Sequence, residues 1–172
     1  MPRLPDLDPA ALTLEQQRVH DNITSGPRGG VRGPFAALLH HPGACDHVQA
    51  MGIHLRFDGV LPGHLRELAI LTAARFWGAE YEWNAHAPIA EKEGLSQGVI
   101  NAIAENRPPD FSSDAESAVH AFCRELHEIH HVGDETYEAA IAAIGQDGVI
   151  ELTVLCGYYT IISMTLRVFD CK

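Results

Sequence analysis

Basic residues are scarce in this sequence of 172 residues, which has 12 lysines and arginines against 23 aspartates and glutamates. The formal net charge of −11 disfavours a nucleic-acid partner, because phosphate binding needs a basic face. It also disfavours an anionic membrane surface. An anionic ligand would have to be drawn in by local cations against the overall field. The composition therefore predicts neither nucleic acid nor membrane as a partner.

Cysteine is also scarce, and the four cysteines form no Cys-x-x-Cys pair and no spacing typical of a zinc site: Cys45, Cys123, Cys156 and Cys171. Cys156 lies in an apolar run and is expected to be a small core residue. The first residues lack the apolar segment of a secretory signal. We therefore expect a cytoplasmic protein with free thiols.

Histidine is abundant, with eleven in the chain, and invites a search for metal ligands. Five residues form one stripe at helical spacing: Glu116, His120, Cys123, His127 and His130. The sequence has no His-Glu-x-x-His, and a metal site needs converging ligands with oriented partners of their own. We predict ordinary boundary histidines, no metal and no cofactor.

Alternating strand patterns are missing, and apolar residues recur at helical spacing almost throughout. The sequence predicts an all-α fold in a single domain over residues 1–172. It comprises an N-terminal helical segment (1–25), a Gly/Pro-rich loop (26–34) and a helical core (35–172). Helices are expected at 9–23, 35–41, 43–58, 62–78, 80–93, 96–104, 113–131, 134–144 and 148–169. Thr13 is expected to cap inside the first helix, and Pro88 to kink or interrupt the fifth.

The last helix, 149–169, is apolar enough to raise the question of a membrane span. It also carries Glu151, Arg167 and several hydroxyl side chains, which disfavour that interpretation. A helix that is apolar nearly all round is otherwise a central core helix or an oligomer contact. Gly157 would permit the close approach of a neighbouring backbone.

Two candidate site residues lie on consecutive helices. Glu67 shares a helical face with apolar residues, where a carboxylate is rarely placed unless something nearby satisfies it. Glu82 and His86 fall on one face of the next helix, and a helical hairpin would bring Glu67 and His86 into one pocket. The alternative is that Glu82 and His86, at i and i+4, form only a weak surface pair.

The central block of the sequence resembles the carboxymuconolactone decarboxylase and alkylhydroperoxidase D superfamily. The resemblance rests on three features: Arg-Glu-Leu-x-Ile-Leu from Arg66, Tyr-Glu-Trp-x-x-His from Tyr81, and Gly94-Leu95 leading to Ile100–Ile103. It extends more loosely over most of the chain. It implies an alkylhydroperoxidase D-like helical bundle and a homo-oligomer, commonly a trimer or hexamer, with the site close to a subunit interface.

The chain departs from the peroxidase branch of that superfamily. The resemblance places Ala79 and Glu82 where the two redox cysteines would stand, while the branch's glutamate and histidine correspond to Glu67 and His86. Thiol-based peroxide reduction needs a thiolate and a resolving thiol, and neither is present there. The usual peroxidase mechanism is therefore not expected.

The remaining groups suit proton transfer on a small carboxylated lactone or keto acid without a cofactor. His86, oriented by Glu67, is expected to be the general acid, and Tyr81 an oxyanion donor. Glu82 and Trp83 are expected to line the substrate pocket. Arg32, in the Gly/Pro-rich loop, is expected to bind a carboxylate, unless that loop is only a surface connector.

Three functions remain open at this point. The first is a lyase or isomerase, for which the resemblance implies 4-carboxymuconolactone as a model substrate. The second is an oxidoreductase-like member with unusual peroxide chemistry. The third is a non-catalytic binding or assembly protein on the same scaffold.

Overall fold

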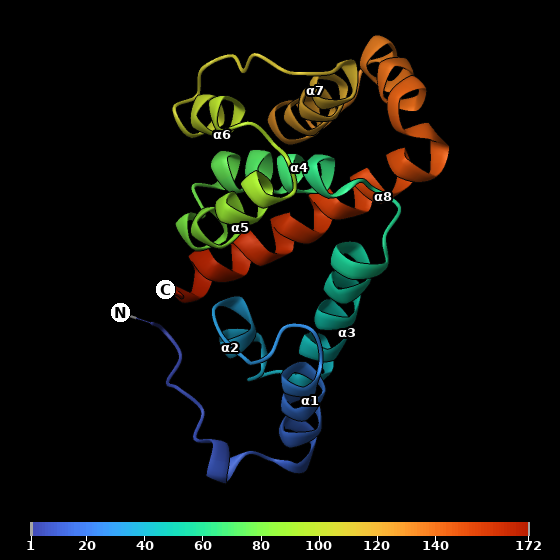
Figure 1. The fold of residues 1–172 in the computed structure, drawn as a ribbon. Helices are drawn as coiled ribbons and strands as arrows, with labels where there is room; N and C mark the ends of the chain where they lie inside the picture. Colours follow the sequence, from blue (N-terminus) through green and yellow to red (C-terminus); the bar gives the residue numbers. More distant parts are fainter. Residues whose placement is uncertain (1, 172) are drawn as a thin grey trace. The chain divides into compact units, whose positions relative to one another are not determined.

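The computed structural model describes residues 2–171, and the described chain is helical with no β-strand (Figure 1). The α-helices are α1 (Leu14–Ser25), α2 (Pro34–Leu38), α3 (Pro42–Ile53), α4 (Gly63–Trp77), α5 (Glu80–Lys92), α6 (Gln97–Ala104), α7 (Asp114–Glu128) and α8 (Asp134–Phe169). A short 3₁₀ helix (Pro9–Ala11) precedes α1, and a π-helical turn (His54–Asp58) follows α3. The predicted all-α class is confirmed.

Residue contacts divide the chain into two compact units. One unit contains the chain up to Asp58 together with the segment from Ile161 onward, and the other is Gly59–Thr160. Helix α8 contributes residues to both. We call them the terminal unit and the central unit. A single domain over the whole chain stays a prediction.

The predicted first helix, 9–23, is wrong at its beginning. Thr13 lies at the N-cap of α1, where its hydroxyl accepts from the Gln16 backbone N–H at 3.2 Å and the Gln16 side chain accepts from the Thr13 N–H at 3.0 Å. This reciprocal capping box satisfies two free donors at a helix start. Residues 9–11 form a separate 3₁₀ turn, capped by Asp8.

The connection between α4 and α5 is short, and Figure 1 shows the two helices side by side in the central unit. Gly78 closes α4 in the left-handed conformation (φ 60°, ψ 37°), which glycine adopts without a steric penalty. Helix α5 begins two residues later and continues through Pro88 to Lys92, so the expected interruption at Pro88 is wrong. The hairpin sets the faces of α4 and α5 against each other.

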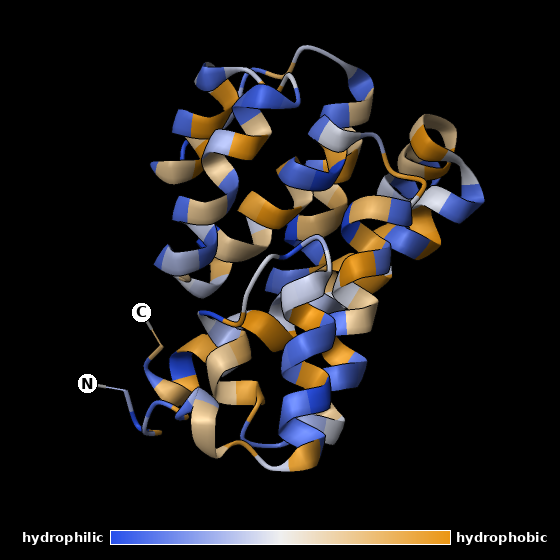
Figure 2. Cartoon of the chain, turned by 60° about the horizontal axis from the view of Figure 1, so that its bottom comes forward, coloured by the Kyte–Doolittle hydropathy of each residue, from blue (hydrophilic) through white to orange (hydrophobic). Residues whose placement is uncertain are grey.

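The core of the central unit is built around α4. Leu68, Ile70 and Leu71 are fully buried, and α4 contacts α5, α6 and α7. Leu152 and Leu155 of α8 are also fully buried. Figure 2 shows hydrophobic and hydrophilic residues sharing individual helices, as expected for amphipathic helices around a core.

A buried carboxylate fixes the chain just before α4. Glu151, from α8, accepts from the backbone N–H groups of Val60 at 2.8 Å and Leu61 at 2.9 Å. A β-carbon at Gly59 would lie 2.5 Å from a Glu151 carboxylate oxygen, so only glycine fits there without a shift. Glu151 therefore anchors the entry to the helix that carries Glu67.

Helix α8 spans Asp134–Phe169 but contains one non-helical residue, Gly145 (φ 69°, ψ 175°). The break matches the predicted pair of helices at 134–144 and 148–169. Helix α8 is also long and apolar enough to cross a membrane by length and composition, yet 61% of its apolar window is buried inside the protein. This burial is typical of a core helix. Cytoplasmic location stays a prediction.

Candidate functional site

Glu67 and His86 meet in the interior of the central unit. The imidazole Nδ1 of His86 lies 2.7 Å from Glu67 Oε2, a distance typical of a charge-assisted hydrogen bond. Glu67 is 1% exposed and His86 is 4% exposed. The predicted hairpin geometry thus brings the two residues together, although 19 residues separate them in the sequence.

The second ring nitrogen of His86 faces two further polar groups. Its Nε2 lies 3.2 Å from the hydroxyl of Tyr159 and 3.5 Å from Glu82 Oε2. The ring of Tyr159 also packs edge-on against the imidazole, with 5.3 Å between the centroids. Since the Glu67 carboxylate accepts at Nδ1, Nδ1 carries a proton in either charge state. Nε2 is therefore the nitrogen whose proton can be exchanged.

The charges around the imidazole favour its protonated form. Burial lowers the pKa of His86, but hydrogen bonds and attraction from Glu67 and Glu82 outweigh burial, so the net shift is upward from the ordinary value of 6.5. Arg66 Nε lies 3.4 Å from Glu67 Oε1 and adds a second positive group. With His86 protonated, two cations face two carboxylates.

The other predicted site residues lie in different settings. Tyr81 is half-buried on the first turn of α5, and Trp83, also half-buried, lines a cavity of about 140 Å³. The other lining residues of that cavity come from the end of α4, the α4–α5 turn, the first residue of α5 and the end of α6: Ala74, Arg75, Gly78, Ala79, Glu80 and Ala104. Ala79, which the resemblance places at the branch's first cysteine, lines the same cavity as Trp83.

Arg32 belongs to the terminal unit and is exposed. Its Nη2 donates to the Arg28 carbonyl oxygen at 3.4 Å. Gly33, which follows it, is the N-cap residue of α2 and has a positive φ of 56°. The role of Arg32 toward a substrate stays a prediction.

Tyr159 was missed by sequence reasoning. It lies 73 residues after His86, on a helix that the sequence assigns to packing and assembly. The only signal in the sequence was a tyrosine within an apolar run. Because a buried tyrosine hydroxyl usually has a hydrogen-bond partner, this pattern indicates a polar neighbour in the core. The sequence pattern does not identify which residue that partner is.

Two buried cysteines, of which only Cys156 was predicted to be a core residue, form a close pair. Cys123 Sγ and Cys156 Sγ lie 3.5 Å apart, and both side chains are buried. The hydrogen bond from Cys123 lowers the pKa of Cys156 to about 6, with a further contribution from His127. Cys156 is therefore a core residue, as predicted, with an unpredicted thiol neighbour.

The predicted histidine stripe lies on α7 except for His130, which follows the end of that helix. Within residues 2–171 no group of three or more His, Cys, Asp or Glu side chains could hold a metal ion. Glu116 instead accepts from the backbone N–H and hydroxyl of Ser112, both at 2.9 Å. The absence of a metal stays a prediction.

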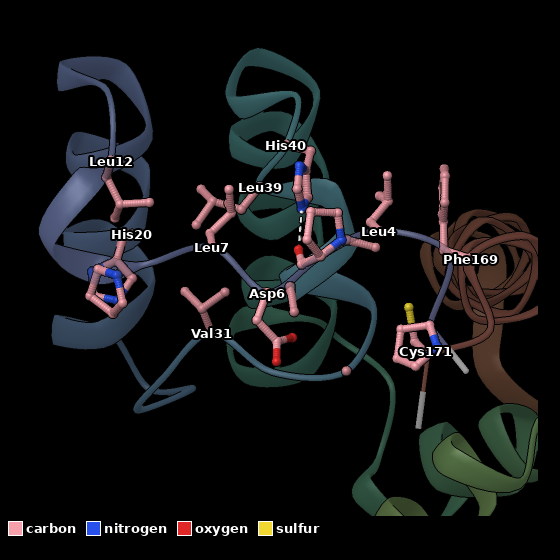
Figure 3. A pocket seen from close by; sticks show the side chains of 16 residues that line it. Leu4, Asp6, Leu7, Leu12, His20, Val31, Leu39, His40, Phe169 and Cys171 are labelled. Atoms are coloured by element: carbon pink, nitrogen blue, oxygen red, sulfur yellow. Dashed lines mark hydrogen bonds between the residues drawn. The ribbon is translucent and has the colours of Figure 1, made fainter.

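The terminal unit contains a separate cavity of about 320 Å³, which the sequence did not predict (Figure 3). The N-terminal segment runs across it, and the backbone oxygen of Pro5 lies 3.0 Å from His40 Nε2. The labelled lining side chains combine aliphatic residues, such as Leu7 and Val31, with Asp6, His20, His40 and Cys171.

Comparison with known proteins gives one family and several structures. Residues 43–125 match the sequence profile of the carboxymuconolactone decarboxylase family. No protein of curated function matches the chain. A crystal structure described as an alkylhydroperoxidase AhpD core, an uncharacterized peroxidase-related protein from Ralstonia eutropha JMP134, aligns with a TM-score of 0.78 at 19% identity. The alignment covers 99% of this chain and 91% of that one.

The debrominase Bmp8 has a similar fold. Its ligand-free structure aligns with a TM-score of 0.72 at 14% identity, covering 92% of this chain and 86% of that one. A cysteine-to-alanine variant of Bmp8 in complex with 2,3,4-tribromopyrrole also aligns with a TM-score of 0.72, at 15% identity, covering 92% and 85%. At these identities the likeness concerns the fold.

Proposed function

Because the chain belongs to the carboxymuconolactone decarboxylase and alkylhydroperoxidase D-like superfamily, we propose that it is a cofactor-free lyase or isomerase acting on a small carboxylated lactone or keto acid. The single observation that carries the proposal is the buried 2.7 Å pair of Glu67 and His86, with Nε2 of His86 facing Tyr159 and Glu82. In this chain Ala79 and Glu82 stand where the peroxidase branch has its thiols.

The proposed chemistry is general acid catalysis at His86 Nε2. Loss of carbon dioxide from a keto acid or lactone leaves a carbanion that must be delocalised as an enolate and reprotonated. An imidazolium with a raised pKa is a suitable proton donor near neutral pH. Glu67 holds the ring by Nδ1 and stabilises the positive charge, as the carboxylate of a histidine–carboxylate pair does.

The other residues have positioning and binding roles in the proposal. Tyr81 donates a hydrogen bond to the developing enolate oxygen, and Trp83 supplies an apolar wall beside the small cavity at the α4–α5 turn. A carboxylate-binding role for Arg32, which belongs to the terminal unit, stays a prediction that its variant tests. Tyr159 and Glu82 hold the Nε2 proton in place between turnovers.

The test is a set of variants assayed on a panel of carboxylated lactones and β-keto acids, with release of carbon dioxide as the readout. His86→Ala and Glu67→Gln are expected to lower turnover by about a hundred- to ten-thousand-fold. Tyr81→Phe should lower turnover by a smaller factor than either of these variants, and Arg32→Ala should chiefly raise KM. His47→Ala, at an exposed histidine, is the matched control.

The ordering of these effects decides the outcome. Near-native turnover in both His86→Ala and Glu67→Gln would make the pair structural. No turnover on any member of the panel would favour a binding or assembly protein on this scaffold.

Thiol chemistry is the second candidate, favoured by the 3.5 Å approach of Cys123 and Cys156. A thiolate at Cys156 would attack a hydroperoxide oxygen and give a sulfenic acid and an alcohol. Cys123 would then condense with it, releasing water and leaving a disulfide. Both side chains are at most 2% exposed, which limits the approach of any peroxide.

Cysteine variants separate the two candidates. We expect no dithiol-dependent hydroperoxide reduction by the purified protein. Cys123→Ala and Cys156→Ala should leave the decarboxylation rate within about twofold, provided the fold survives. A peroxide-reducing activity that disappears with either variant would replace the acid–base proposal.

A further inference from the structure

A larger cavity of the central unit contains none of the residues of the Glu67–His86 cluster. It has a volume of about 420 Å³ and lies against α4, α7 and the segment that follows α6. Its size matches ordinary small-molecule sites, which run from about 300 to 1,000 Å³. Nothing in the proposed reaction uses it.

The cavity concentrates positive charge in an acidic protein. Arg75, Arg107 and Arg124 all line it, and Glu128 is the only carboxylate among its lining residues. The whole chain has 12 lysines and arginines against 23 acidic residues, so a quarter of its basic side chains converge at this one place. Such a local reversal of the field attracts anions.

The three arginines differ in how far they are already neutralised. Arg124 makes a two-pronged hydrogen bond to Glu128, at 2.8 and 2.9 Å, and Arg107 Nε donates to Glu105 at 2.6 Å. Arg75 has no carboxylate partner in the described chain, and its Nε donates to the amide oxygen of Asn106 at 3.1 Å. Arg75 therefore keeps an unneutralised, half-buried guanidinium at the cavity wall.

A buried histidine at the same wall has an unsatisfied ring nitrogen. His127 is 7% exposed, and its Nε2 has no hydrogen-bond partner. Leaving a buried polar atom without a hydrogen-bond partner is unfavourable, so such an atom calls for an explanation. A ligand group in the cavity would supply the missing partner.

Flat apolar surface completes the cavity. The ring of Phe76 is stacked on His127, with 5.2 Å between centroids and 18° between planes, and Phe76 is 45% exposed. Ile103 and Pro108 add further apolar lining. A bare phosphate would leave this surface unused, whereas a conjugated ring or diene would cover it.

We propose that this cavity binds a small planar organic carboxylate. The carboxylate pairs with the Arg75 guanidinium, with Arg107 close enough to share the charge, and the planar part lies against Phe76. A polar substituent reaches Nε2 of His127. The site is separate from the proposed reaction centre and would serve as an effector or second ligand site.

The test is calorimetric titration of the purified protein with three probes. Benzoate should bind, and benzamide, which has the same ring without the charge, should bind at least tenfold more weakly. Inorganic phosphate at the same concentration should not compete with benzoate. Equal binding of benzamide, competition by phosphate, or no detectable benzoate binding up to millimolar concentration would each overturn the proposal.

Variants locate the bound benzoate. Arg75→Gln should weaken binding by about tenfold or more, the value of one charge-assisted hydrogen bond. Arg107→Gln should weaken it severalfold. Arg18→Gln, which removes an exposed arginine of the terminal unit, is the charge-matched control and should leave affinity unchanged.

Two further outcomes discriminate between neighbouring sites. Arg75 also lines the small cavity beside Trp83, so a loss with Arg75→Gln but none with Arg107→Gln would place benzoate there and refute the proposal. His86→Gln should leave benzoate affinity within about twofold. A loss of binding in a correctly folded His86→Gln protein would assign benzoate to the reaction centre instead.

Discussion

At His86 two opposing effects meet on one imidazole. Burial disfavours the charged ring, while Glu67 and Glu82 favour it, and the carboxylates prevail. The result is a cation held inside the protein by two anions, with Arg66 and Tyr159 as the remaining polar neighbours. Breaking such a pair on one side leaves an uncompensated buried charge.

This arrangement predicts a pH dependence of stability. The pKa of His86 is higher in the folded protein than the unfolded value of about 6.5. Its contribution to the free energy of unfolding is therefore fully present below about pH 6.5 and is lost as the pH rises through the folded pKa. Urea unfolding of the wild type and of His86→Gln at pH values from 6 to 9 measures it. The difference in free energy of unfolding between the two should shrink toward alkaline pH.

Taking the difference between the two proteins cancels the pH dependence that comes from other groups titrating in this range, including Cys156 with its pKa of about 6. A difference that grows toward alkaline pH would show that the imidazole is held neutral in the fold.

Residues within one hairpin could be predicted from sequence, and residues on a distant helix could not. Helical periodicity places Glu67 and His86 on inward faces, and a short connection then makes their meeting the simplest packing. Tyr159 approaches Nε2 only because α8 packs against the same core, which periodicity does not encode. The pairing of Cys123 with Cys156 escaped prediction for the same reason.

At the scale of elements, glycine and the capping residues set the boundaries. The break at Gly145 falls in the gap between the predicted helices at 134–144 and 148–169. The π-helical turn at His54–Asp58 was predicted as ordinary helix, since a change of hydrogen-bond register leaves no mark on an apolar pattern.

Gly145 provides a test of that break. Its φ of 69° with ψ of 175° lies in a region open almost only to glycine, so Gly145→Ala should destabilise the protein by about 1–3 kcal/mol. Gly157→Ala is the matched control on the same helix. Its β-carbon would meet nothing within 4 Å, and the change should be neutral or stabilise by roughly 0.5–1 kcal/mol. Thermal unfolding of the two variants measures both effects.

A Gly145→Ala protein as stable as the wild type would mean that the two halves of α8 can join into one regular helix. A destabilised Gly157→Ala protein would instead reveal a neighbouring backbone at Gly157, as predicted for an assembly contact.

At the scale of the whole molecule, α8 carries an exposed apolar stripe. Five large hydrophobic residues, each 41–56% exposed, recur at the spacing of one helical face: Ile150, Val154, Ile161, Met164 and Val168. The exposed Gly157 falls on the same face. Alternating intervals of four and three residues are typical of a helix that packs against another helix.

We therefore expect a homo-oligomer, a trimer or hexamer, in which α8 lies at a subunit contact. Light scattering at micromolar concentration should give a mass several times that of the 18.8 kDa chain. The double variant Ile150→Glu with Val154→Glu should shift the protein toward monomer while keeping its helical circular dichroism. Thr153→Glu, an exposed change on the same helix but off the stripe, is the control. A monomeric wild type would contradict the expectation.

The passage of α8 through both units has a consequence for how the chain can be divided. The units separate between Asp58 and Gly59 and again between Thr160 and Ile161, and the second boundary falls in mid-helix. A protease finds no loop there. A cut at the first boundary alone leaves one fragment that contains the whole central unit and none that contains the whole terminal unit. A premature stop codon between Gly59 and Thr160 would remove the segment from Ile161 onward, which the terminal unit needs although the rest of that unit lies before Gly59. The central unit is therefore continuous in the sequence, whereas the terminal unit is built from both ends of the chain and has no single uninterrupted coding segment.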